Sequence, residues 1–174
     1  MSADKARKVK LLLLDVDGVL TNGSVTYVGK DIETKSFNIK DGLGIKLLQD
    51  AGIMVGIITG RVSAMVERRA KELGLEEIVQ GREDKGVALL EAAKRNNIDT
   101  DYIAYMGDDL PDIKAMQKAG FAIAPADAHA DVLSVADWTA TKNGGAGAVR
   151  EACDFILKSM DSYTVVTAPF WGQE

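Results

Sequence analysis

The chain has 174 residues, a length that suits one domain with a hydrophobic core, and we expect residues 1–174 to form that single domain. Its formal charge of −5, without a basic patch interleaved with aromatic residues, argues against a nucleic-acid-binding protein. One cysteine excludes an intrachain disulfide and fits a reducing cytoplasm. We find no signal peptide and no apolar run long enough to span a membrane.

An apolar run over residues 9–14 is followed by Asp15, Asp17 and Gly18. A short apolar run bounded by a turn residue predicts a strand that is buried on both faces. Carboxylates at the end of such a strand lie where open α/β sheets bind their ligands. Because buried carboxylates are unfavourable without a cation or hydrogen-bond donors, the pair indicates a site. The alternative is a strand end whose acids are simply solvated.

Two β-prone segments flank residues 28–31, which predicts a β-hairpin over about residues 23–38, directly after the acidic strand end. The hairpin is either a surface insertion or a segment that covers the site or pairs with another subunit, because exposed strand edges pair readily. Asp41 or a nearby polar residue is the expected cap of the next helix.

Two later junctions carry polar residues of a different kind. The apolar run 53–58 predicts a strand that ends in Thr59, whose hydroxyl and neighbouring amides at a helix start suit an anion. An ordinary helix cap would have the same sequence. Lys85 opens the predicted helix after a strand at 78–80, where its charge opposes the helix dipole. A nearby anion would remove that conflict.

The predicted strand at 102–106 is followed by Asp108, Asp109 and Asp112. Carboxylates this close repel one another and require a cation or a lysine among them. The only histidine, His129, is expected to begin a loop or a helix rather than to act as a base. The tail over about residues 161–174 is apolar, and the sequence leaves open whether it packs on its own domain or on a neighbouring subunit.

Strands and helices alternate along the chain, which predicts an α/β fold with a Rossmann-like, mainly parallel sheet flanked by helices. The carboxyl ends of parallel strands meet at one edge, so the acids, the hydroxyl and the lysine should converge there. Carboxylate oxygens suit Mg²⁺, with water and phosphate oxygens completing its coordination. The lack of cysteine and histidine clusters argues against zinc.

In this order and spacing the residues resemble the four motifs of the haloacid dehalogenase superfamily of phosphatases. The resemblance covers nearly the whole chain and implies a haloacid dehalogenase-like fold, with a β-hairpin insertion after the first strand and no cap domain. The motifs are Asp15-Val-Asp17-Gly-Val-Leu-Thr21, Thr59-Gly60-Arg61, Lys85 and Gly107-Asp108-Asp109-x-x-Asp112. A finer resemblance, to the phosphatases of 3-deoxy-D-manno-octulosonate 8-phosphate (KDO 8-phosphate), is carried by the short length, the hairpin and residues 37–45 and 144–151.

The resemblance implies that Asp15 is the nucleophile, which forms an aspartyl-phosphate, and that Asp17 is the general acid and base. Asp15, the backbone carbonyl of Asp17 and Asp108 would hold Mg²⁺. Thr59 would donate to a phosphoryl oxygen, and Lys85 would neutralise the phosphoryl group and Asp15.

Further residues follow from the same resemblance. Asp109 and Asp112 would orient Lys85 or metal-bound water. The substrate, a small sugar-acid phosphate, would be contacted by Gly60 and Arg61 beside Thr59 and Lys85, with the guanidinium of Arg61 on the sugar carboxylate. Arg69 would reach the substrate carboxylate from a neighbouring subunit, or it is simply a solvated charge on a helix.

The resemblance also implies a cytoplasmic homotetramer in which neighbouring subunits close the site through the hairpins, in the supply of KDO for lipopolysaccharide. The apolar hairpin side chains are Val25, Tyr27, Val28 and Ile32. Three alternatives stay open: a phosphatase of a sialic-type nonulosonate 9-phosphate, which Arg61 disfavours because such relatives tend to carry Glu there; a receiver-like phospho-acceptor; and a catalytically idle assembly protein.

Overall fold

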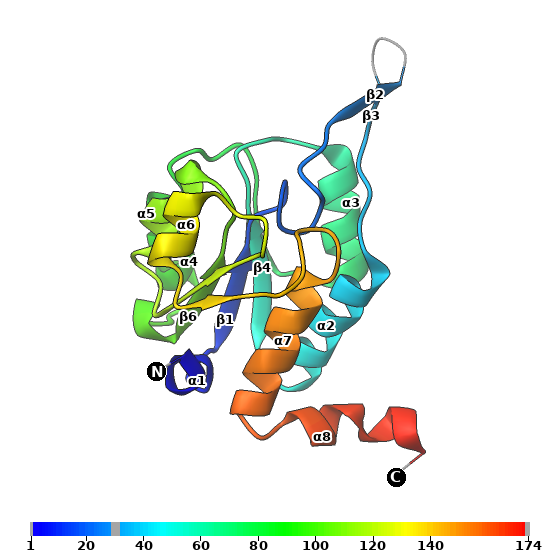
Figure 1. Cartoon of the computed structure of the whole chain (residues 1–174), viewed down its shortest axis with the longest axis vertical. Coiled ribbons are helices and arrows are strands. Elements are labelled where there is room, and N and C mark those ends of the chain that lie inside the picture. Colours follow the sequence, from blue (N-terminus) through cyan, green and yellow to red (C-terminus); the bar gives the residue numbers. More distant parts are fainter. Residues whose placement is uncertain (1, 29–31, 173–174) are drawn as a thin grey trace.

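The computed structural model describes residues 2–28 and 32–172, and the side chain of Ile32 lies outside the described part. A six-stranded sheet in the order β5-β4-β1-β6-β7-β8 forms the centre, and all its strand pairs are parallel (Figure 1). The strands are β1 (Leu11–Leu14), β4 (Met54–Ile58), β5 (Glu77–Val79), β6 (Ile103–Met106), β7 (Phe121–Ala124) and β8 (Trp138–Thr139). The predicted parallel α/β sheet is confirmed.

Helices pack on both faces of the sheet, and β1 shows why its sequence suits this position. Leu12 and Leu14 belong to one hydrophobic core, whereas Leu11 and Leu13 belong to the other. Successive strand residues point to opposite faces, so an all-apolar strand needs cover on both sides. One face is covered by α1 (Ser2–Ala6), α2 (Ile39–Asp50), α3 (Ala64–Leu73) and α7 (Ala148–Ser159), and the other by α4 (Lys85–Arg95), α5 (Ile113–Met116) and α6 (Ala130–Val135).

The predicted hairpin is formed by β2 (Thr26–Val28) and β3 (Ile32–Thr34), which pair antiparallel with Tyr27 opposite Glu33. Its turn, residues 29–31, lies outside the described residues. In Figure 1 the hairpin projects beyond the carboxyl ends of the sheet strands. Within the described part of the chain, the hairpin is the segment inserted between β1 and α2.

The cap of α2 is a polar residue near Asp41, the second of the two predicted possibilities. Asn38 caps this helix, and its side-chain oxygen accepts a hydrogen bond from the amide of Lys40 at 2.8 Å. Asp41 lies in the first turn and is buried, and its Oδ1 atom accepts from the amide of Arg150 at 2.8 Å. Asp41 therefore satisfies an otherwise unpaired amide at the start of α7 instead of capping its own helix.

The tail begins with α8 (Tyr163–Thr167), whose Tyr163 and Val166 pack against the core of their own chain. Phe170 and Trp171, at the end of the described tail, are 66% and 77% exposed. The tail lies at the opposite end of the molecule from the hairpin (Figure 1). As predicted, His129 begins a helix, because its Nδ1 atom accepts from the amide of Asp131 at the start of α6.

No helix among the described residues combines the length and apolar character needed to cross a membrane.

Candidate active site

The candidate site lies at the end of β1, where the order in which the chain adds strands to the sheet reverses. β1 is flanked by β4 and β6, with Leu14 aligned with Ile57 on one side and Met106 on the other. The chain builds the β4 side first and then crosses to β6, which makes the end of β1 a topological switch point. The amide of Asp15 donates to the carbonyl of Met106 at 2.9 Å, which fixes the nucleophile candidate beside the β6 end.

Nearly all of the predicted site residues line one cavity of about 610 Å³ at this edge. A cavity of this size can hold a small molecule. Arg69 is the predicted residue that does not line it. The lining residues are Asp15, Asp17, Gly23, Thr59, Gly60, Arg61, Glu83, Lys85, Asp108, Asp109, Pro111 and Asp112.

Lys85 is the first residue of α4, and its side chain is only 6% exposed. Its Nζ atom lies 2.8 Å from Oδ1 of Asp15 and 2.6 Å from Oδ1 of Asp112. Burial lowers the pKa of Lys85, but the two carboxylates outweigh burial and the pKa is raised overall. The lysine is therefore a fixed positive charge between two acids, and these acids offset its conflict with the helix dipole.

Asp112 is held by donors on both of its oxygens. Oδ1 accepts from Lys85 and from the hydroxyl of Tyr105, the latter at 2.7 Å. Oδ2 accepts from the amides of Asp108 at 3.0 Å and Asp109 at 3.2 Å. Sequence reasoning missed Tyr105, although a tyrosine inside an otherwise apolar strand signals that its hydroxyl has a buried partner.

Asp109 has a different environment from Asp112. Its Oδ1 atom accepts from the amide of Leu110 at 2.8 Å and caps the short 3-10 helix η2 (Leu110–Asp112). The predicted pairing with Lys85 is thus seen for Asp112, whereas the carboxylate of Asp109 shapes the turn that presents Asp108 and Asp112.

The acidic cluster fits a divalent cation. Oxygens of Asp15, Asp108 and Asp112 lie within 4.8 Å of one another. Because Asp112 already accepts from four donors, Asp15 and Asp108 are the pair left to face an ion. The Oδ1 atom of Asp108 is buried and has no hydrogen-bond partner among the described residues. An orphaned carboxylate oxygen in a set of hard oxygen donors suits Mg²⁺.

The pKa values of the two acids support the same conclusion. Burial, followed by repulsion from Asp112, raises the pKa of Asp15 to about 6. Burial, followed by repulsion from Asp15, raises the pKa of Asp108 to about 8. Burial and the charge of Asp112 disfavour the ionised form of both acids, and Asp15 adds to the effect on Asp108, so a bound cation would stabilise both carboxylates.

Gly18 makes room for Asp108. Its φ angle is +97°, a left-handed conformation that side chains disfavour. A Cβ atom at this position would lie 2.0 Å from Oδ2 of Asp108. The glycine that follows Asp17 is therefore needed both for the turn and for the approach of the third acid.

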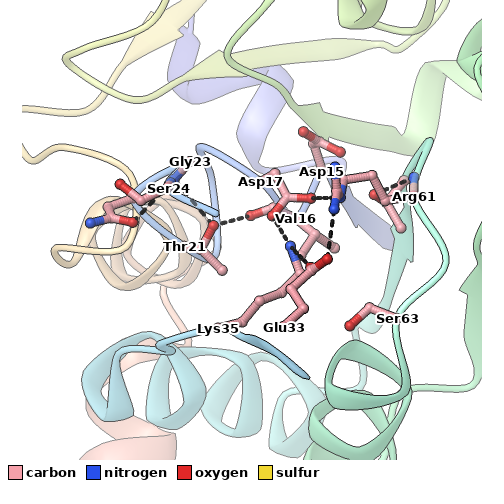
Figure 2. A network of polar contacts seen from close by, with 12 residues as sticks. Asp15, Val16, Asp17, Thr21, Gly23, Ser24, Glu33, Lys35, Arg61 and Ser63 are labelled. Carbon is pink, nitrogen blue, oxygen red and sulfur yellow. Dashed lines mark hydrogen bonds and ion pairs between the residues drawn. The ribbon is translucent and has the colours of Figure 1, made fainter. Parts of the chain in front are cut away.

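Asp17 faces a different set of groups from Asp15 (Figure 2). The Nζ atom of Lys35 donates to Oδ1 of Asp17, and Nε of Arg61 lies 3.9 Å from Oδ2. Arg61 also donates from Nη2 to Oε2 of Glu33 at 2.7 Å. Sequence reasoning missed Glu33 and Lys35. Their signal was the pair of opposite charges two positions apart at the end of the predicted hairpin, since residues two apart in extended chain lie on one face.

The position of Thr59 differs from its prediction, and Arg69 lies apart from the other predicted residues. Thr59 is buried at the end of β4, but α3 begins only at Ala64, so Thr59 lies in a loop and not at a helix start. Its Oγ1 atom accepts from the amide of Arg61 at 3.4 Å. Arg69 lies on α3 beside Gly42, with Nη1 3.5 Å from Oε2 of Glu72, outside the cavity of its own chain.

The arrangement combines two carboxylates in unlike surroundings. Asp15 is buried, contacts an ammonium group and faces the candidate cation position, as a nucleophile for an anionic phosphoryl group requires. Asp17 points to the basic groups at the hairpin, where it can exchange a proton with a leaving group. Phosphoryl transfer from a phosphate monoester is the chemistry that this pair can perform.

Comparison with known proteins gives the same class of chemistry. Residues 75–152 match the family model of haloacid dehalogenase-like hydrolases. The chain is 42% identical over 160 residues to the 3-deoxy-D-manno-octulosonate 8-phosphate phosphatase KdsC of Escherichia coli K12, covering 90% of this chain and 85% of KdsC.

Solved structures agree. The crystal structure of the Moraxella catarrhalis 3-deoxy-D-manno-octulosonate 8-phosphate phosphatase, in complex with magnesium, phosphate and KDO, superposes with a TM-score of 0.95 at 46% identity, over 97% of each chain. The cobalt-bound phosphatase of Haemophilus influenzae has a TM-score of 0.90 at 37% identity, over 92% of this chain and 94% of that one. The predicted resemblance is confirmed: this chain belongs to the 3-deoxy-D-manno-octulosonate 8-phosphate phosphatase family of the haloacid dehalogenase-like hydrolases.

Proposed function

We propose that this protein is a phosphatase that hydrolyses KDO 8-phosphate to KDO and inorganic phosphate, with Mg²⁺ as its cofactor. The observation that carries the proposal is the placement of Lys85 between Asp15 and Asp112, with the orphaned oxygen of Asp108 beside them. Its relatives support the choice of substrate, since one was crystallised with magnesium, phosphate and KDO.

Asp15 attacks the phosphorus, and the bond from phosphorus to the sugar oxygen breaks. Asp17 gives its proton to that oxygen, which leaves as the sugar hydroxyl. Asp17 then takes a proton from water, and the water oxygen attacks the phosphorus of the aspartyl-phosphate. The acyl phosphate bond breaks, inorganic phosphate leaves, and Asp15 is restored as a carboxylate.

The remaining groups stabilise charge. Asp15, the backbone carbonyl of Asp17 and Asp108 would hold Mg²⁺, which would supply positive charge for the phosphoryl group. The ammonium of Lys85 neutralises Asp15 and the phosphoryl oxygens on the other side. Thr59 donates its hydroxyl to a phosphoryl oxygen, next to the backbone of Gly60.

Arg61 is the residue that we assign to the sugar carboxylate. It lines the cavity and is half-exposed, so its guanidinium can form two parallel hydrogen bonds with a carboxylate. The identity of this residue favours the eight-carbon sugar acid, because the similar phosphatases of sialic-type nonulosonate 9-phosphates tend to carry Glu where this chain has Arg61.

We also propose a cytoplasmic homotetramer that is assembled through the hairpins, in the supply of KDO for lipopolysaccharide. Tyr27 is 69% exposed on β2, and Val25 and Val28 are exposed beside it. An exposed apolar hairpin is suited to pairing with another copy. In this assembly Arg69, which lies outside its own cavity, would serve a neighbouring site.

The function is tested by phosphate release from KDO 8-phosphate and from a sialic-type 9-phosphate, each with Mg²⁺. We expect the eight-carbon sugar to be preferred, and Asp15→Asn to lose at least about a thousandfold in kcat. Asp50→Asn, the same change at an exposed site, is the matched control and should retain full activity. Preference for the nine-carbon sugar would overturn the substrate, and no release from either would overturn the function.

The assembly is tested separately by light scattering and by mixing inactive variants. Tyr27→Glu should dissociate the tetramer. Asp15→Asn and Arg69→Ala subunits, refolded together, should regain part of the activity if Arg69 serves a neighbour's site. A monomeric wild-type protein with full activity would contradict this arrangement.

A further inference from the structure

Four charged side chains form a closed ring at the base of the hairpin (Figure 2). Going around it, Asp17 contacts Lys35, Lys35 contacts Glu33, Glu33 contacts Arg61, and Arg61 returns to Asp17. The charges alternate in sign, so each group has an opposite charge on both sides. The ring joins three separate segments: the loop after β1, the segment of β3 and the residue after it, and the loop after β4.

Lys35 is the buried member of this ring. Its side chain is 1% exposed, whereas Asp17 and Glu33 are about one-fifth exposed. A buried ammonium group is unfavourable unless carboxylates surround it, and here Asp17 and Oε1 of Glu33, the latter at 3.3 Å, fill that role. A lysine at the surface for solubility alone would extend into solvent, so its burial against Asp17 needs another explanation.

The contact limits how the carboxylate of Asp17 can turn. The terminal torsion of an aspartate is broad, so an unrestrained carboxylate samples many orientations. A proton is transferred only when the carboxylate lies within hydrogen-bond reach of the leaving oxygen. The bond from Lys35 fixes one oxygen of Asp17 and leaves Oδ2 toward Arg61 and the cavity.

Glu33 has the corresponding relation to Arg61. Its Oε2 atom accepts from Nη2 of Arg61 at 2.7 Å. The hydrogen bond from Arg61 and the charge of Lys35 hold the pKa of Glu33 below its usual value, so it stays ionised. One side of the guanidinium is thereby anchored, and the other side can face a ligand in the cavity.

We propose that Lys35 and Glu33 are positioning residues: Lys35 aligns Asp17 for proton transfer, and Glu33 aligns Arg61 for the carboxylate of the sugar. This inference rests on the proposed function and adds two residues to it. Because Glu33 lies on β3 and Lys35 follows the last residue of that strand, the segment that returns from the hairpin sets the geometry of the acid and of the recognising arginine together.

The role of Lys35 is tested by a double-mutant cycle with KDO 8-phosphate. Lys35→Met should lower kcat about 10- to 100-fold, as loss of a group that orients a reacting residue does. In an Asp17→Asn background the same change should lower kcat less than about twofold, because its target is already gone. Lys35→Gln, which keeps an N–H donor, should lose less than Lys35→Met. Lys40→Met, at an exposed lysine, is the matched control.

The role of Glu33 is read from KM rather than kcat. Glu33→Gln should raise KM for KDO 8-phosphate about tenfold with kcat within about twofold of wild type, the pattern of lost substrate binding. On an Arg61→Ala background it should add nothing. Glu76→Gln, at an exposed glutamate, is the control.

The outcomes separate this inference from the function on which it rests. If the wild type releases phosphate but Lys35→Met lowers activity equally with and without Asp17, or Glu33→Gln leaves KM unchanged, the positioning roles are wrong and the function stands. Thermal melting of each variant shows whether a loss of activity is a loss of fold. If Lys35→Met does not fold, the same comparison with and without Asp17 is made with Lys35→Gln. A wild type without phosphatase activity would overturn both.

Discussion

The Nζ atom of Lys85, on α4, lies 2.8 Å from the Oδ1 atom of Asp15, at the end of β1. The same nitrogen contacts Asp112, so one ammonium group serves the proposed nucleophile and an acid that holds it in place. The incoming phosphoryl group would share this positive charge with Asp15. Attack by one anion on another is thereby made easier at the atom where the new bond forms.

Lys85→Met should therefore abolish most of the activity. We expect kcat to fall at least about a hundredfold, because the substitution removes a fixed positive charge from the reacting centre and water cannot supply an equivalent charge there. Lys118→Met, at an exposed lysine, should leave kcat unchanged. Steady-state kinetics with saturating Mg²⁺ measures both, and a Lys85→Met enzyme with wild-type kcat would contradict the assigned role.

Tyr105→Phe should reduce stability more than activity. The change removes a hydroxyl that donates to Oδ1 of Asp112 at 2.7 Å in a fully buried position. Hydrogen bonds to charged groups contribute about 1.5–3 kcal/mol, so the free energy of unfolding should fall by that amount. Lys85 still holds the same oxygen, and kcat should fall less than about tenfold. Tyr102→Phe, at a partly exposed tyrosine, should change stability by less than about 0.5 kcal/mol in urea denaturation.

Substitution of two glycines with similar φ angles distinguishes the effect of backbone strain from that of a steric clash with Asp108. Gly18 has φ +97° and Gly52 has φ +82°, but only at Gly18 would a Cβ atom meet Asp108, since nothing lies within 4 Å at Gly52. Both changes to alanine should lower stability by about 1–2 kcal/mol. Gly18→Ala alone should also raise the Mg²⁺ concentration needed for half-maximal activity, by about tenfold or more. Equal Mg²⁺ requirements in the two variants would show that Asp108 tolerates the added methyl group.

Many residues of this site could be predicted from local sequence patterns. Apolar runs that end in Asp15, Thr59 and Asp108 mark strand ends, and parallel strand ends must share an edge. Lys85 could be placed with them because its charge at a helix start required a nearby acid. These inferences need only the strand pattern and the sign of each charge.

The remaining features depend on distances that no local pattern encodes. Lys35 meets Asp17 only because the chain that returns from the hairpin passes the loop after β1, and a charged residue next to a strand usually remains in water. Asp41 was one of the candidates for the cap of its own helix, but Asn38 caps it, and the carboxylate of Asp41 accepts from the start of α7, far along the chain. Tertiary packing decided both contacts, which is why neither could be assigned from neighbouring residues.

Asp41 offers a test of how burial alone shapes the pH dependence of stability. Its side chain is 1% exposed, and burial raises the pKa of Asp41 above its usual value although the amide of Arg150 donates to it. The folded protein therefore keeps this proton at pH values where the unfolded chain has released it. The stability contributed by Asp41 falls as the pH rises from the ordinary pKa, about 4, through the raised one, and is constant above it.

Asp41→Asn has no proton to release and keeps Oδ1 as an acceptor for Arg150. Its stability relative to wild type should therefore increase with pH across that window and then level off. Urea denaturation of both proteins at a series of pH values gives the difference directly, and the other titrating acids cancel in it. A difference that decreases as the pH rises would mean that Asp41 is stabilised as a carboxylate by the start of α7, with burial the weaker effect, and a flat difference would mean that the two effects cancel.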